Sequence, residues 1–213
     1  MKIIITLILF ILSGAVSAER PSNEQPMYGG THNPTVEKNE EHSASAASLG
    51  WQYFNNGDLN TAIKRFNQSW MFDRENAEAY WGFGLIMGRR STEGNTETNL
   101  QESIKYLAKA NQLSKNDYRI IVDLAFSKTL LGYFLKENKK ATYKNFFREA
   151  DALFKKAQNI KSNYPPLYYN WSVLKFYEED YSLAESKLKK AKKQDYKARP
   201  NYEKELSDKL KNS

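Results

Sequence analysis

Residues 53–66, YFNNGDLNTAIKRF, indicate the end of one helix, a tight turn and the start of a second helix. Gly57 permits the left-handed backbone of such a turn, and Asp58 is a favoured residue at a helix start. Tyr53, Ile63 and Phe66 are large apolar residues placed to meet across the two helices. The stretch therefore predicts an antiparallel pair of short amphipathic helices.

Small residues recur at fixed distances along the chain, which indicates that this helix pair is repeated. Gly50 is followed by Ala62 after twelve positions and by Ser69 after seven more, and Ser172, Ala184 and Ala191 repeat the same spacing. A separation of 22 positions occurs three times: Ala62–Gly84, Ser103–Ala125 and Ala150–Ser172. Antiparallel helices approach closely only where side chains are short, so these positions predict the helix crossings.

The pattern resembles the tetratricopeptide repeat family, whose unit is a 34-residue helix-turn-helix. Gly50 and Gly84 are 34 positions apart, and the first unit matches the family at Leu49-Gly50, Tyr53, Gly57-Asp58, Ala62 and Phe66. The fourth unit, NWSVLKFYEEDYSLAESKL, keeps the spacing with Ser172 and Glu179 in place of glycines. The chain departs from the family pattern in lacking the usual proline near the end of the first unit. The second and third units also carry insertions between their helices.

The resemblance implies an all-α fold, a right-handed α-solenoid of four helix-turn-helix units with a C-terminal capping helix. The expected organisation is a signal peptide at 1–18, a flexible arm at 19–40 and a repeat domain at 41–213. The units would lie near 43–76, 77–117, 118–164 and 165–197, with the cap near 200–211. The expected helices are 43–55, 59–72, 77–91, 97–114, 118–137, 144–161, 165–178, 181–194 and 201–211.

The first eighteen residues, MKIIITLILFILSGAVSA, are typical of a secretory signal. Lys2 precedes an apolar run that is too short to span a bilayer, and small residues at 16–18 predict cleavage after Ala18. The alternative is an uncleaved membrane anchor. The chain has no cysteine, which excludes a lipid anchor on that residue and favours a bacterial periplasm over a eukaryotic secretory route. We expect an exported protein, periplasmic or secreted.

The arm that follows holds one apolar stretch, PMYGG at 26–30. Met27 and Tyr28 either dock on the folded domain or a partner, or belong to a disordered leader. The two sequons, at Asn67 and Asn170, fall inside expected helices and are read as chance matches.

The sequence offers little for catalysis. His32 and His42 are the only histidines, cysteine is absent, and no phosphate loop or metal-ligand spacing is present. GFGLIMG at 82–88 superficially resembles a nucleotide loop, but it lies in an expected helix with no strand before it. We therefore expect no enzyme activity, no cofactor, no metal and no nucleic-acid partner.

The resemblance implies a concave surface lined by the first helix of each pair, which we expect to bind a protein or peptide partner. The alternative is that residues such as Trp81 and Phe126 only pack between helices. The expected groove residues are Trp51, Phe54, Asn55, Trp81, Leu85, Arg89, Arg119, Val122, Asp123, Phe126, Tyr169, Asn170, Val173 and Tyr177.

A second hypothesis rests on charge. The chain has a net charge of +7, and residues 185–213 contain ten basic and five acidic residues. These lysines form either a solvated helix face or a surface for an anionic membrane or polymer.

Overall fold

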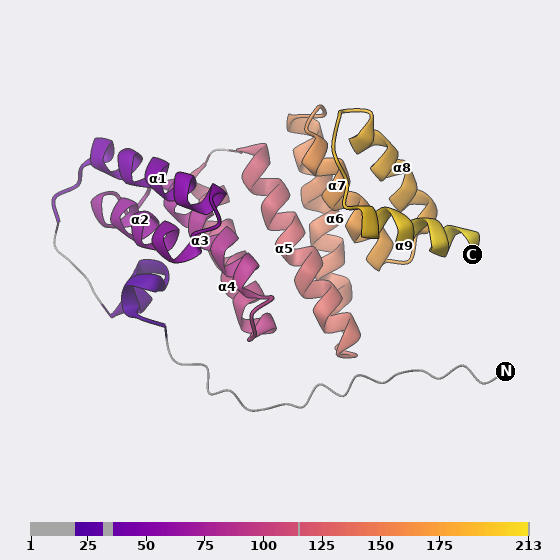
Figure 1. Cartoon of the computed structure of the whole chain (residues 1–213), viewed down its shortest axis with the longest axis horizontal. Coiled ribbons are helices and arrows are strands. Elements are labelled where there is room, and N and C mark those ends of the chain that lie inside the picture. Colours follow the sequence, from indigo (N-terminus) through magenta and orange to yellow (C-terminus); the bar gives the residue numbers. More distant parts are fainter. Residues whose placement is uncertain (1–19, 32–35, 115, 213) are drawn as a thin grey trace.

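The computed structural model describes residues 20–31, 36–114 and 116–212. The predicted signal peptide at 1–18 lies outside the described residues, as does His32. The described part of the chain is all-helical, as predicted, and Figure 1 shows its helices arranged side by side as successive pairs. Among these residues, no helix combines the length and the apolar character needed to cross a bilayer.

Nine α-helices form four antiparallel pairs and one final helix within the described residues, which is an α-solenoid of helix pairs. The predicted bounds differ from the observed ones by three residues or fewer. The helices are α1 (Glu40–Asn55), α2 (Leu59–Phe72), α3 (Ala77–Arg90), α4 (Thr96–Leu113), α5 (Tyr118–Glu137), α6 (Tyr143–Ile160), α7 (Pro165–Tyr177), α8 (Tyr181–Lys192) and α9 (Pro200–Lys211).

The helix starts follow from local chemistry. The side chains of Asn39, Asp58, Asn76, Asp117 and Asp180 each accept a backbone N–H from the first turn of the helix they precede. Prolines occupy the first positions of α7 and α9, where no N–H donor is needed.

The turns within the first and last pairs each contain one residue in the left-handed backbone conformation. Gly57, between α1 and α2, has a φ of 83°. Glu179, between α7 and α8, has a φ of 67° and takes the place of that glycine, as the sequence predicted.

The small residues lie at the helix crossings, as predicted. Ala62, Ser103, Ala150 and Ser172 are fully buried. A Cβ atom on Gly84 would lie 2.5 Å from Cγ of Leu107. The core around these crossings forms two large clusters, one around α2, α3 and α4 and one around α5 to α9.

The insertion in the third unit lengthens α5 beyond the repeat pattern. Its extra turns place Leu131 and Leu135 against Leu100 at the start of α4, which makes a third, smaller cluster. Lys140 and Glu97 join the two insertions by an ion pair of 2.7 Å. The inserted segments therefore support each other.

The arm is docked on the domain. Residues Ser22–Glu24 and Pro26–Gly30 form two short 3-10 turns, η1 and η2, which pack against α2. Pro26 is buried, and Met27 and Tyr28 pack on the core around α2 and α3. Of the two alternatives for PMYGG, the structure shows docking on the folded domain.

Asn67 lies fully buried beneath this arm, which agrees with reading its sequon as a chance match.

Candidate functional site

The first helices of the pairs form the inner face of the solenoid. Helix α1 contacts α3, α3 contacts α5, and α5 contacts α7, so the first helices follow one another along one side of the stack. All the groove residues expected from the sequence lie on these four helices. The inner face divides into an N-terminal half on α1, α3 and the start of α5, and a C-terminal half on α5, α7 and α9.

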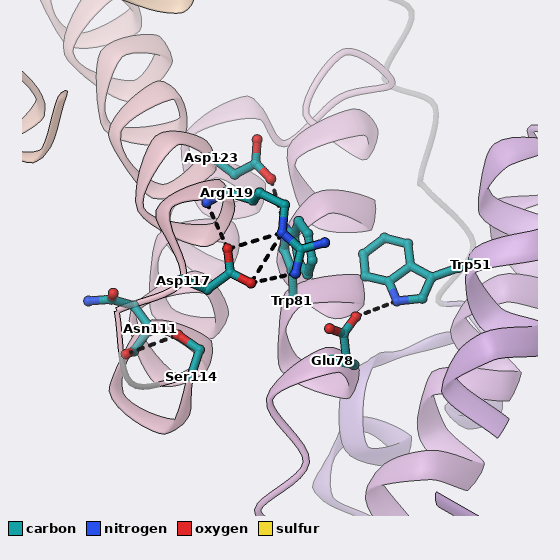
Figure 2. A network of polar contacts seen from close by, with 8 residues as sticks. All are labelled: Trp51, Glu78, Trp81, Asn111, Ser114, Asp117, Arg119 and Asp123. Atoms are coloured by element: carbon teal, nitrogen blue, oxygen red, sulfur yellow. Dashed lines mark hydrogen bonds and ion pairs between the residues drawn. The ribbon is translucent and has the colours of Figure 1, made fainter. Parts of the chain in front are cut away.

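Two tryptophan–carboxylate hydrogen bonds cross the N-terminal half from helix to helix (Figure 2). Nε1 of Trp51 on α1 donates to Glu78 on α3 at 2.6 Å, and Nε1 of Trp81 on α3 donates to Asp123 on α5 at 2.7 Å. The two indole rings meet edge to face, with their centroids 4.8 Å apart. Both indole N–H groups therefore donate to carboxylates of the same chain.

Arg119 covers the face of the Trp81 indole ring that the neighbouring helices leave exposed. Its Cζ lies 4.9 Å from the centroid of the indole ring, and its Nη2 donates to Asp117 at 2.5 Å (Figure 2). Trp81 is 9% exposed, and Arg89 covers the ring of Phe54 in the same way at 4.2 Å. The N-terminal half is thus a closed aromatic layer under two arginines, and its aromatic rings pack between helices.

Asp123 is the most perturbed carboxyl of this layer. Burial raises the pKa of Asp123 to about 7, although the hydrogen bond from Trp81 and the positive charge of Arg119 oppose the rise. The carboxyl therefore changes its charge near neutral pH. In the described ranges, no group of three or more His, Asp or Glu side chains is placed to hold a metal ion.

The C-terminal half is open and contains a groove of about 540 Å³ between α5, α7 and α9. Four predicted residues line it, namely Phe126, Tyr169, Val173 and Tyr177. Its remaining walls are Leu130, Arg199, Pro200, Asn201, Tyr202 and Glu205.

Aromatic contacts shape this groove. Tyr169 stacks on Tyr196 with centroids 4.7 Å apart, and Tyr177 stacks on Tyr133 at 4.0 Å. Burial raises the pKa of Tyr177 to about 12, so its phenol stays neutral at physiological pH. Asn170 is half-buried, and no described residue is hydrogen-bonded to its side-chain amide.

The other predicted residues contribute less to a surface. Phe54, Val122 and Trp81 are each 9% exposed or less, whereas Asn55, Arg89 and Arg119 are exposed. Leu85 is half-buried. Arg119 is paired with Asp117.

The sequence reasoning missed the contribution of α9 and of the later turns of α5. Leu130 and Tyr133 follow Phe126 at four and seven positions, so helical spacing placed them on the same face. Arg199, Tyr202 and Glu205 were assigned only to a cap. The position of α9 across α7 carries no signal in the sequence.

No protein-family model matches the chain, and a search of curated proteins finds no similar one.

Proposed function

We propose that the chain is an exported tetratricopeptide-type protein of the bacterial envelope that acts without catalysis, binding a segment of another protein on its inner face. The observation that supports this most is the groove of about 540 Å³ in the C-terminal half. The spacing of small residues and the helix pairs support the repeat assignment.

The chemistry of the groove suits a peptide with apolar side chains. Phe126, Leu130 and Val173 supply apolar area, and aromatic side chains such as Tyr177 add area at low entropic cost. Arg199 and Glu205 give one positive and one negative charge at its edge. Asn170, next to Tyr169 on α7, lies outside the lining of the groove, and its amide is available to hold a peptide that extends beyond the groove.

In-cell photo-crosslinking tests this proposal. A photoreactive residue at Asn170 or Tyr177 should capture a discrete protein, whereas one at Lys156, an exposed position on α6, should not. Phe54 and Tyr169 are less suitable positions, because they are 7% and 6% exposed. Capture that is equal at Asn170 and Lys156 would contradict a groove-specific partner.

A variant separates binding from folding. Asn170→Ala with Tyr177→Ser should abolish capture while circular dichroism keeps its helical signal, because both side chains are only half-buried. Capture that is unchanged in this variant would place the partner elsewhere on the molecule.

A second candidate function is contact with an anionic surface, and one observation favours it. Lys187 and Lys190 on α8 have no carboxylate partner among the described residues, and their ammonium groups lie over the rings of Trp171 and Tyr168 at 3.3 and 4.3 Å. Burial and the neighbouring lysines lower the pKa of Lys187 to about 8. An anion bound here would relieve the repulsion between these charges.

Vesicle co-sedimentation tests the second candidate. Binding to anionic vesicles should fall steeply as salt rises, because exposed charges are screened within about 8 Å at physiological ionic strength. It should also weaken in Lys187→Gln with Lys190→Gln. Binding that survives both changes would exclude this surface.

A further inference from the structure

The docked segment, residues 20–30, packs against α2, the second helix of the first pair. It contacts Lys64 and Asn67 directly. Asn60 lies on the same face of α2, four residues before Lys64, and accepts a hydrogen bond from Arg90. Beyond α2 the segment reaches Arg90 at the end of α3 and Glu93 in the following loop. We call the surface formed by these five residues the outer seam, because it joins the first two helix pairs.

Asn67 recognises the backbone of the docked segment. It is fully buried, and its Nδ2 donates to the carbonyl oxygens of Asn23 and Gln25 at 3.0 and 2.8 Å. Its Oδ1 accepts the backbone N–H of Tyr28 at 3.4 Å. A buried amide without partners is costly, so Asn67 requires a peptide backbone, or a substitute for it, at this place.

Arg90 is a second buried donor that points at the same segment. It is 3% exposed, its Nη1 donates to the carbonyl oxygen of Glu24 at 2.7 Å, and its Nη2 donates to Oδ1 of Asn60 at 3.0 Å. No ion pair between described residues includes Arg90, and burial lowers its pKa to about 10. Consecutive carbonyl groups of the segment thus meet two buried side chains of the domain.

Side-chain contacts give the seam its selectivity. Glu24 pairs with Lys64 at 3.0 Å, and Arg20 pairs with Glu93 at 2.5 Å. Pro26 is buried, and Met27 packs on the core around α2 and α3. A fitting ligand is therefore a turn-forming peptide with an acidic residue two positions before a proline and an apolar residue after it.

The shape of the docked segment is imposed by the seam. Met27 and Tyr28 have φ values of 52° and 55°, a left-handed conformation that residues other than glycine avoid. Such backbone persists only where surrounding contacts hold it. The chain rejoins the domain at Asn39, whose N–H donates to the carbonyl oxygen of Phe72 at 3.0 Å. Residues 20–30 thus resemble a bound peptide more than a part of the helical framework.

We propose that the outer seam is a peptide-binding site, distinct from the inner groove, and that it accepts residues 20–30 of a second copy of this chain. The contacts in such a complex are those that the chain makes with its own segment. In a single chain, the covalent link gives the segment an effective concentration on the order of millimolar, which favours self-occupation. A second copy binds when the chain's own segment is undocked.

Two full-length variants test this by complementation. Asn67→Ala breaks the seam and leaves the segment intact, whereas Met27→Asp with Tyr28→Asp breaks the segment and leaves the seam intact. Each alone should sediment as a monomer. Their equimolar mixture should contain a species of twice the mass, in a fraction that rises with concentration. Arg90→Gln is an independent seam variant that should behave as Asn67→Ala does.

The control is a chain that carries all three substitutions, which should form no complex with the segment variant. A mixture that stays monomeric up to the highest soluble concentration, with helical content retained, would overturn the proposal. So would a complex formed equally by the control chain, since another surface would then be responsible. Unfolding of both Asn67→Ala and Arg90→Gln would also overturn it, because the segment would then be an integral part of the core.

Discussion

At the scale of single residues, serine hydroxyls join the helices of three pairs at their closest approach. Oγ of Ser103 donates to the carbonyl oxygen of Gly84 at 2.7 Å, and Oγ of Ser172 donates to that of Ala184 at the same distance. Ser43 reaches the carbonyl of Ser69 at 2.8 Å. A carbonyl has two lone pairs, so it accepts this bond in addition to its helical one. Serine is therefore small enough for the crossing and leaves no polar group unsatisfied.

Gly84→Ala should lower the free energy of unfolding by about 1–3 kcal/mol, the usual cost of overpacking. The added Cβ would lie 2.5 Å from Cγ of Leu107 and 3.2 Å from its backbone nitrogen, so the helix itself must move. Gly88→Ala is the matched control in the same helix, because its nearest atom is 3.3 Å away. Urea unfolding measures both, and equal stabilities for the two variants would contradict the close crossing.

The carboxyl of Asp123 should make stability depend on pH. Burial raises its folded-state pKa to about 7, above the unfolded value, so the folded state binds the extra proton. The contribution of Asp123 to the free energy of unfolding is then complete near pH 4 and is lost as the pH rises to about 7. The loss is up to about 4 kcal/mol, at about 1.4 kcal/mol per pKa unit.

Asp123→Asn should remove that decline, because the amide oxygen can still accept the bond from Trp81. The measurement is urea unfolding at pH 5 and pH 8 for both proteins. The parent chain should lose more stability between the two pH values than the variant. An equal change in the free energy of unfolding for the two proteins would show that the carboxyl of Asp123 is ionised at both pH values.

At the scale of elements, α9 both closes the stack and builds the groove. Tyr202 contacts the rings of Tyr169 and Phe176, each at 5.6 Å between centroids, and its hydroxyl lies 2.5 Å from Oγ of Ser172. Leu206, one turn later, is buried against the same cluster. One helix thus covers the last apolar face and forms one wall of the binding groove.

Tyr202→Ala should therefore lower the free energy of unfolding by about 2 kcal/mol, less than a fully buried aromatic residue would. Tyr202→Phe should cost about 1 kcal/mol, because it loses only the hydrogen bond to Ser172. Thermal unfolding of the two variants gives the comparison. A larger loss for Tyr202→Phe than for Tyr202→Ala would show that the ring packing contributes nothing.

The sequence predicted the elements far better than their contacts. The 22-residue spacing of small residues placed the crossings, because close packing of helices permits few alternatives. No periodic pattern in the sequence predicts the docking of Met27 and Tyr28. Trp81 was assigned to an open groove because helical spacing predicts only that it faces inward from α3. The spacing does not predict whether a side chain from another helix covers it. The side chain that covers it, Arg119, lies on the next first helix.

At the scale of the whole molecule, each helix pair packs on the pairs beside it, so stability is distributed along the stack. The described structure has no strands that tie distant parts together, and its inserted segments contact only neighbouring pairs, Lys140 with Glu97 of the second pair and Lys136 with Glu179 of the fourth. Such a molecule opens locally, and its ends open at a lower free energy than its centre.

Gly50→Val should loosen the first pair while leaving the last pairs intact. A Cβ on Gly50 would lie 2.7 Å from the ring of Phe66, which also packs on Gly82 in the next pair. Hydrogen exchange should show lost amide protection in α1, α2 and the start of α3, with α6 to α8 unchanged. Uniform loss along the chain would mean that the stack unfolds as one unit.

The tryptophan hydrogen bonds have a consequence for spectroscopy. The chain has four tryptophans, and each indole N–H donates to a residue on another helix: Trp51 to Glu78, Trp70 to Tyr80, Trp81 to Asp123 and Trp171 to Asp151. The four acceptors differ, so the four indole protons should resonate separately in a proton spectrum. In unlabelled protein, each indole proton signal then reports on the one helix–helix contact that its hydrogen bond crosses. A change in that signal on heating, stretching or ligand binding would show which contact has changed.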